Sequence, residues 1–171
     1  MESTFRTWYE RKMLATQELA EETERVKQIL NSVKTIAVVG ISKNQHKDSH
    51  YVGRYLKNAG YTIVPVNPTA DTILGEKAYP DIASIPFDID VIDIFRRPSD
   101  IPGVIDAVLT IHADVVWLQF GTGLHPAEKR RVEQGGKTFI QNRCIKVDHQ
   151  FLMRHSFNQS SIQSSVREET L

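Results

Sequence analysis

Two short segments of the sequence carry the groups with which proteins bind phosphate. Gly40, at the end of an apolar run, allows the backbone to turn sharply and approach a ligand, and Ser42 adds a hydroxyl donor for a phosphate oxygen. Arg96 and Arg97 follow a second apolar run and offer two planar, permanently charged guanidinium groups. Further cationic groups of the first segment are Lys43, His46 and Lys47. A ligand with several phosphate groups would suit these two segments.

Apolar and amide groups accompany these cations. Phe95 and Pro98 lie on either side of the two arginines and offer apolar surface for a nucleotide base. Gln119 and Gly121 follow a further apolar run. Gln119 supplies an amide that donates and accepts, and Gly121 permits a close approach of the backbone, although it could also serve only a turn. We therefore treat this third segment as part of the candidate site.

The glycine pattern of dinucleotide-binding folds is incomplete here. Ser42 and Gln45 stand where that pattern requires glycines, and the stretch from Ser42 to Ser49 is too long for the compact fingerprint. At the end of the next apolar run, Asn67 precedes Pro68 where an acidic residue should hold the ribose hydroxyls. An amide can still hydrogen-bond a ribose, but the sequence argues against a nicotinamide cofactor.

The sequence offers few groups for catalysis. Its 6 histidines show no metalloprotease spacing and no cysteine–histidine cluster, so we expect no metal site. Cys144 is the single cysteine and the sole intrinsic nucleophile; Arg143 beside it could favour the thiolate, and the alternative is an inert, half-buried thiol. A structural alternative also exists for the two arginines, which could form a surface ion pair with Asp93 or Asp100.

A parallel sheet would bring these segments together. Short apolar runs predict five strands, at residues 35–41, 61–66, 90–95, 114–118 and 137–140. Helical spacing and capping residues predict helices between them, at about residues 48–60, 98–111 and 126–135. This alternation predicts an α/β fold, a Rossmann-like doubly wound parallel sheet of about five strands. We expect the strand order 3-2-1-4-5, which places the switch point between the first and fourth strands.

Two further segments flank the predicted sheet. The spacing of Thr7 and Glu10 is that of a capping box, and apolar residues at helical intervals predict a helix over residues 8–30. We expect this helix to pack on the flank of the domain, and a homodimer through it is the alternative. The sequence thus predicts three parts: an N-terminal helical extension over 1–33, a ligand-binding domain over 34–154 and a weakly ordered, serine-rich tail over 155–171.

Composition narrows the possible partners and location. The 21 basic and 21 acidic residues balance, so no overall field attracts the chain to nucleic acid or to an anionic membrane. No run approaches the about 18 apolar residues of a membrane span, and the amino terminus has no apolar core of signal-peptide length. A single cysteine suits a reducing compartment. We expect a cytoplasmic protein without a nucleic acid or membrane partner.

Six blocks of sequence, in this order, resemble a known family. They are Val-Val-Gly-Ile-Ser (38–42), Asp-Ser-His-Tyr-Val-Gly-Arg-Tyr-Leu (48–56), Gly-Tyr-Thr-Ile-Val-Pro-Val-Asn-Pro (60–68), Ile-Leu-Gly-Glu-Lys-Ala-Tyr (73–79), Asp-Ile-Phe-Arg-Arg-Pro (93–98) and Val-Val-Trp-Leu-Gln-Phe-Gly (115–121). Together they resemble the stand-alone CoA-binding domain proteins, which are similar to the CoA-binding domain of the succinyl-CoA synthetase alpha subunit. The resemblance covers about residues 34–150.

The resemblance implies a Rossmann-like domain that binds coenzyme A, with its 3′-phosphate and pyrophosphate at the two basic segments. It assigns the phosphate-contacting region to Gly40, Ser42 and Ser49, the neighbourhood of the adenosine to Val66, Asn67 and Pro68, and the far wall to Phe95, Arg96 and Pro98. Ligase activity is not implied, because the synthetase's phosphorylated histidine lies outside this domain and has no counterpart here.

We therefore expect a coenzyme A-binding protein without catalytic activity, acting as a carrier, buffer or regulatory module, with coenzyme A or an acyl-CoA as its ligand. The alternative is an enzyme on the same fold, either an NAD(P)-binding oxidoreductase or a thiol-redox protein that uses Cys144.

Overall fold

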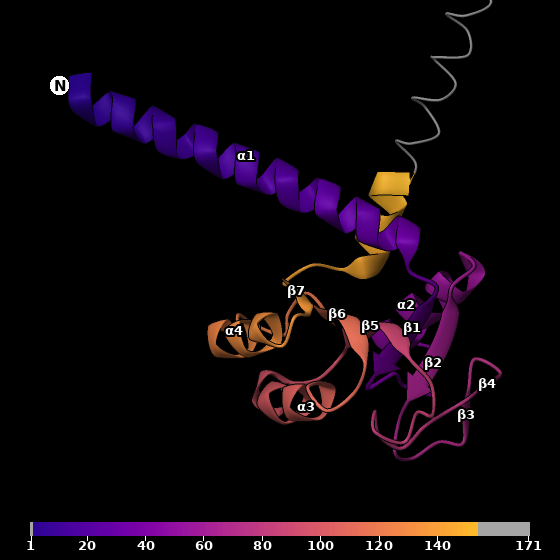
Figure 1. The fold of residues 1–171 in the computed structure, drawn as a ribbon. Helices are drawn as coiled ribbons and strands as arrows, with labels where there is room; N and C mark the ends of the chain where they lie inside the picture. Colours follow the sequence, from indigo (N-terminus) through magenta and orange to yellow (C-terminus); the bar gives the residue numbers. More distant parts are fainter. Residues whose placement is uncertain (1, 154–171) are drawn as a thin grey trace, which may run out of the picture. The chain divides into compact units, whose positions relative to one another are not determined.

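The structure, a computed structural model, describes residues 2–153 of the chain (Figure 1). The chain divides into two units. One consists of Val33–Val147 and contains the whole five-stranded sheet, and the other includes, among the described residues, 2–32 and 148–153. The tail predicted over residues 155–171 lies outside the described residues.

The larger unit is built on five parallel strands in the order β2-β1-β5-β6-β7. Their bounds are β1 Thr35–Val39, β2 Thr62–Val66, β5 Ile89–Ile94, β6 Ala113–Leu118 and β7 Thr138–Gln141. The connecting helices are α2 Asp48–Asn58, α3 Ile101–Val108 and α4 Pro126–Gln134. Helices α3 and α4 lie beside each other (Figure 1). The crossover from β1 to β2 through α2 runs across the sheet in the direction opposite to the crossovers through α3 and α4. Because such crossovers are right-handed, α2 lies on the face of the sheet opposite α3 and α4. The predicted α/β, Rossmann-like fold with an added N-terminal helix is confirmed.

The predicted strand order is wrong, because β5 pairs with β1 and not with β2. The Asp90 carboxylate accepts hydrogen bonds from the backbone N–H groups of Lys34 (2.7 Å) and Thr35 (2.8 Å), which ties the start of β5 to the start of β1. Strand β2 lies at the sheet edge, where Pro65 interrupts no ladder. The carbonyl of Pro65 accepts a hydrogen bond from the Tyr79 N–H on the outer side of the strand. Because the carbonyl and the nitrogen of one strand residue point to the same side, the Pro65 nitrogen faces outward too. The switch point therefore falls between β1 and β5.

Alternate strand residues face opposite sides of the sheet. The side chains packed beneath α3 and α4 form an apolar cluster to which all five strands contribute, for example Val39, Ile92 and Val116. On the α2 side, Asp93 lies in register between Val38 and Trp117. Trp117 is fully buried.

Some elements differ from those predicted. Helix α1 spans Glu2–Ser32 and begins before Thr7, because no helix-breaking residue precedes that position. Its residues 11–22 are exposed. The long connection 67–87 contains a hairpin of β3 (Thr72–Ile73) and β4 (Glu76–Lys77). Residues 145–153 form a helix that was not predicted. Among the described helices, none combines the length and the apolar character that a membrane span requires.

Candidate functional site

The carboxyl ends of β1, β5 and β6 open into one cavity, which we call the first cavity. Its volume is about 500 Å³, and the N-terminal turn of α2 contributes to its lining. Most of the residues predicted to bind a ligand are brought together here: Gly40, Ser42, Ser49, Phe95, Arg96, Arg97, Pro98, Gln119 and Gly121. The location follows from the fold, because ligands of open α/β sheets bind outside the carboxyl ends of strands at the switch point.

A second cavity of about 470 Å³ lies between the end of β2 and helix α3. Val66 and Pro68, predicted to lie near an adenosine, line this second cavity together with Val104 of α3. Gly40 and Arg96 line both cavities. One ligand that occupies both would therefore pass Arg96.

Two predicted residues, Asn67 and Lys43, line neither cavity. The Asn67 Nδ2 donates to the carbonyl of Ile41 at 2.7 Å, and its Oδ1 accepts from the Thr69 N–H at 2.8 Å. The Lys43 Nζ donates to the Thr69 carbonyl at 3.2 Å. Both side chains thus join the loop after β1 to the loop after β2, and they support the site from outside it.

The loop after β1 is fixed to the first turn of α2. The Ser42 N–H donates to Ser49 Oγ at 3.0 Å, and His50 Nδ1 donates to the Ser42 carbonyl at 2.8 Å. Lys47, at the N-cap, makes no capping hydrogen bond with its side chain, and Asp48 is the first helical residue. The first N–H groups of a helix have no intrahelical acceptor, and the helix dipole adds positive potential there. Residues 47–49 line the first cavity, so this helix end, with the side chains of Lys47 and Asp48, forms part of its wall.

Gly40 has a structural reason for being glycine. Its φ is +83°, in the left-handed region, and a Cβ on it would lie 2.3 Å from the Phe95 carbonyl oxygen and 3.0 Å from Arg96 Cδ. Its N–H donates to the Val66 carbonyl at 3.0 Å. The space that the missing side chain leaves is thus filled by the loop after β5. Gly40 lets the two loops of the switch point approach each other.

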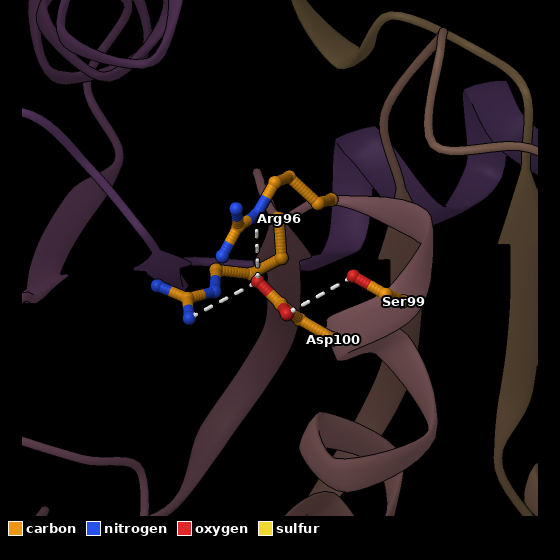
Figure 2. Close-up of polar contacts among 4 residues, drawn as sticks. Arg96, Ser99 and Asp100 are labelled. Carbon is orange, nitrogen blue, oxygen red and sulfur yellow. Dashed lines mark hydrogen bonds and ion pairs between the residues drawn. The ribbon is translucent and has the colours of Figure 1, made fainter.

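The two arginines share one carboxylate, as the structural alternative from the sequence allowed. A terminal nitrogen of Arg96 lies 3.3 Å from Asp100 Oδ2, and Arg97 Nε lies 3.5 Å from the same oxygen. Ser99 Oγ donates to Asp100 Oδ1 at 3.3 Å, so the carboxylate lies between Ser99 and Arg96 (Figure 2). The Arg96 and Arg97 side chains remain 41% and 83% exposed. Two guanidinium groups with one carboxylate leave a net positive charge at the cavity.

Asp93 is the alternative ion-pair partner that the arginines do not use. It is fully buried, and its Oδ1 accepts from Gln119 Nε2 at 2.7 Å. Its Oδ2 is the one buried side-chain oxygen or nitrogen without a hydrogen-bond partner in the described part of the chain. Burial raises the pKa of Asp93 to about 7, and the hydrogen bond from Gln119 opposes this change. Asp93, an acid between the apolar residues Ile92 and Ile94 of β5, was visible in the sequence, but its burial beside Gln119 was not.

Sequence reasoning missed three residues of the first cavity, Asp48, Phe120 and Thr122, whereas Lys47, named as a cationic group of the first segment, does line it. Phe120 is 74% exposed, an unusual state for a large apolar side chain beside a cavity. It directly follows Gln119, so its place at the end of a strand was a signal for it. Cys144 is half-buried and lines neither cavity, and the described residues contain no group of acidic, histidine or cysteine side chains that could hold a metal.

Comparison with known proteins defines the class of this fold and site. The family model described as a CoA binding domain matches residues 34–150, and the chain belongs to this family. This span contains both cavities.

Individual relatives include both stand-alone proteins and parts of larger enzymes. The uncharacterized protein YneT of Bacillus subtilis is 40% identical over 124 residues, which are 72% of this chain and 91% of that protein. A hypothetical protein from Pyrococcus horikoshii has a solved structure that matches with a TM-score of 0.72 and 32% identity, over 77% of this chain and 92% of that one. An ADP-forming acetate–CoA ligase of Archaeoglobus fulgidus is 38% identical over 73 residues, which are 42% of this chain and only 11% of the ligase.

Proposed function

We propose that this protein binds coenzyme A, free or acylated, without acting on it, and that the ligand occupies both cavities. The observation that carries the proposal is that, in a member of the CoA-binding family, Arg96 and Arg97 line the same cavity as the N-terminal turn of α2. Guanidinium groups and free helix N–H groups are the two common means of binding phosphate. Coenzyme A, with its pyrophosphate and 3′-phosphate, supplies the several phosphates that these groups suit.

The second cavity supports a place for the adenosine. Its apolar walls include Val39, Val66 and Val104, and Asp81 and Ser99 offer polar groups at its border. A purine ring needs apolar faces and a few hydrogen-bonding partners at its edge. With the adenosine there, Arg96 would lie beside the phosphates, because it lines both cavities.

A binding role without catalysis fits the residues that line the cavities. No histidine or cysteine is among them. Asp48 lines the first cavity, and Asp81 and Asp100 line the second, where Asp100 pairs with Arg96 and Arg97. Neither cavity therefore offers a cysteine nucleophile or a histidine base. A nicotinamide dinucleotide is less well supported, because Asn67 stands in place of the ribose-binding acid. The Asn67 side chain is also already hydrogen-bonded to backbone groups of the neighbouring loops.

Isothermal titration calorimetry with coenzyme A, dephospho-coenzyme A and NAD tests the proposal. Coenzyme A should bind most tightly, and Arg96→Ala should weaken it about 10- to 100-fold, as expected for the loss of a charge-assisted contact worth roughly 1.5–3 kcal/mol. Arg131→Ala is the matched control, since Arg131 is a similarly exposed arginine that pairs with Asp106 between α3 and α4. Tighter binding of NAD, or equal effects of the two substitutions, would refute the proposal.

A further inference from the structure

The side chain of Gln119 is held by a group that lies behind the first cavity. Gln119 is 4% exposed and lines that cavity. Its NH2 group donates to Asp93 Oδ1 at 2.7 Å. Its backbone is fixed as well, because the Gln119 N–H donates to Ile94 O and its carbonyl accepts from both Thr122 Oγ1 and the Thr122 N–H. Rotation of the whole residue away from the cavity would break these contacts.

One end of the Gln119 amide remains open to a ligand. The amide oxygen Oε1 has no hydrogen-bond partner among the described residues, yet it is not among their buried, unpartnered atoms. It therefore keeps contact with solvent, in a residue that lines the cavity. An amide oxygen accepts hydrogen bonds and does not donate them, so it suits a hydroxyl or N–H group and repels a phosphate oxygen.

Asp93 sets this orientation. An ionised carboxylate only accepts hydrogen bonds, so turning the amide over would place two acceptor oxygens against each other. No other hydrogen bond holds the carboxyl, since Oδ2 has no partner in the described part of the chain. Asp93 lies in β5 between Val38 and Trp117 and lines neither cavity, so it reaches a ligand only through Gln119.

We propose that Asp93 is a positioning residue that fixes the Gln119 amide with its oxygen toward the first cavity, where it recognises a neutral hydrogen-bond donor of the ligand beside the phosphates. This inference rests on the proposed function and adds the chemistry of a second contact. In coenzyme A the hydroxyl and amide N–H groups of the pantetheine arm and the adenine amino group belong to this class. The cavity thus discriminates between neutral and anionic parts of one ligand.

A double-mutant cycle measured by calorimetry with coenzyme A at pH 8 tests the proposal. Gln119→Leu should weaken binding about fivefold to tenfold, the value of one neutral hydrogen bond. Asp93→Leu should have a similar effect in the wild-type background and less than a twofold effect in the Gln119→Leu background, because Asp93 acts only through Gln119. An Asp93→Leu effect that is absent, or equal in both backgrounds, overturns the proposal.

Further variants keep the test decisive if Asp93→Leu does not fold. Asp93→Asn preserves the shape, but its amide can donate or accept, so we expect about twofold to threefold weaker binding that disappears in the Gln119→Leu background. The side-chain NH2 resonances of Gln119, identified by their loss in Gln119→Leu, should shift in Asp93→Asn. Gln141 is the matched control, because its amide oxygen accepts from the His125 N–H and it lines neither cavity. Gln119 resonances that do not move would overturn the proposal, whereas wild-type protein that fails to bind coenzyme A would refute the proposed function itself.

Discussion

The buried carboxyl of Asp93 should make the protein less stable as the pH rises, and Asp93→Asn should remove this loss. The pKa of Asp93 is about 7 in the folded chain, against 3.8 for an unperturbed aspartate. The folded state therefore holds a proton between about pH 4 and pH 7 that the unfolded state has released. Over this range the free energy of unfolding falls by about 1.4 kcal/mol per pH unit, to a total of about 4 kcal/mol.

The amide of Asp93→Asn has the same shape and does not ionise. Like the protonated acid, it accepts from Gln119 with its oxygen and leaves a donor group unpaired, one O–H in the acid and an NH2 group in the amide, so variant and wild type should be similar in stability near pH 4. Going from pH 5 to pH 8, the stability of the variant relative to wild type should rise by about 2.7 kcal/mol. All other titrating groups are the same in both proteins and cancel in this difference.

Urea unfolding at pH 5, 6.5 and 8, followed by tryptophan fluorescence, measures this difference. Trp117 is fully buried next to Asp93 in register, so its emission should report the loss of the sheet. Asp106→Asn serves as control, since Asp106 is an exposed aspartate and its replacement should give a small difference that does not follow the same course with pH. Parallel stability profiles of wild type and Asp93→Asn would refute the argument, because they would show an ordinary pKa for the buried acid.

Three further substitutions test other parts of the structure. Gly40→Val should destabilise the domain by more than 2 kcal/mol in urea unfolding, because its side chain would collide with the Phe95 carbonyl; a variant of full stability would contradict this. Asn67→Ala should lower the free energy of unfolding by about 1–3 kcal/mol through lost hydrogen bonds to the loops; unchanged stability with lost CoA affinity would instead place Asn67 in the ligand site. The homodimer through α1 that the sequence left open stays a prediction, and Leu19→Lys, which would place a charge on an exposed apolar position of this helix, should lower the dimer fraction in sedimentation equilibrium; a monomer under all conditions would contradict it.

The fold was predictable because its strands are continuous apolar runs separated by clear helix signals. Their order was not predicted correctly, since both orders allow right-handed crossovers and each strand looks equally buried. One local signal did favour the observed order. Pro65 cannot donate to a ladder, and a proline within a strand indicates an edge, which is where β2 lies.

The candidate site was predictable to the extent that topology determines it. Residues just after β1, β5 and β6 meet because the carboxyl ends of parallel strands share one edge. Asn67 and Lys43 follow the same rule along the chain, yet their side chains bond to backbone carbonyls of neighbouring loops. Whether such a side chain enters the cavity or bonds to a neighbouring loop depends on the distances between the loops, and these distances cannot be derived from spacing in the sequence. The hairpin after β2 was missed for a similar reason, since its turn places Leu74 at a φ of +57°, where a leucine is rarely found.

Asp93 should affect both the stability of the domain and its affinity for the ligand. A fully buried acid with one unpartnered oxygen costs free energy at neutral pH, and an apolar residue or asparagine in its place would avoid most of that cost. Costs of this kind are common at functional sites, where stability is given up for a defined geometry. If Asp93 serves the ligand through Gln119, the two sets of measurements should diverge. Asp93→Asn should be more stable than wild type at pH 8 and bind coenzyme A less tightly. A variant that gained stability and kept full affinity would leave the buried acid without a role in the site.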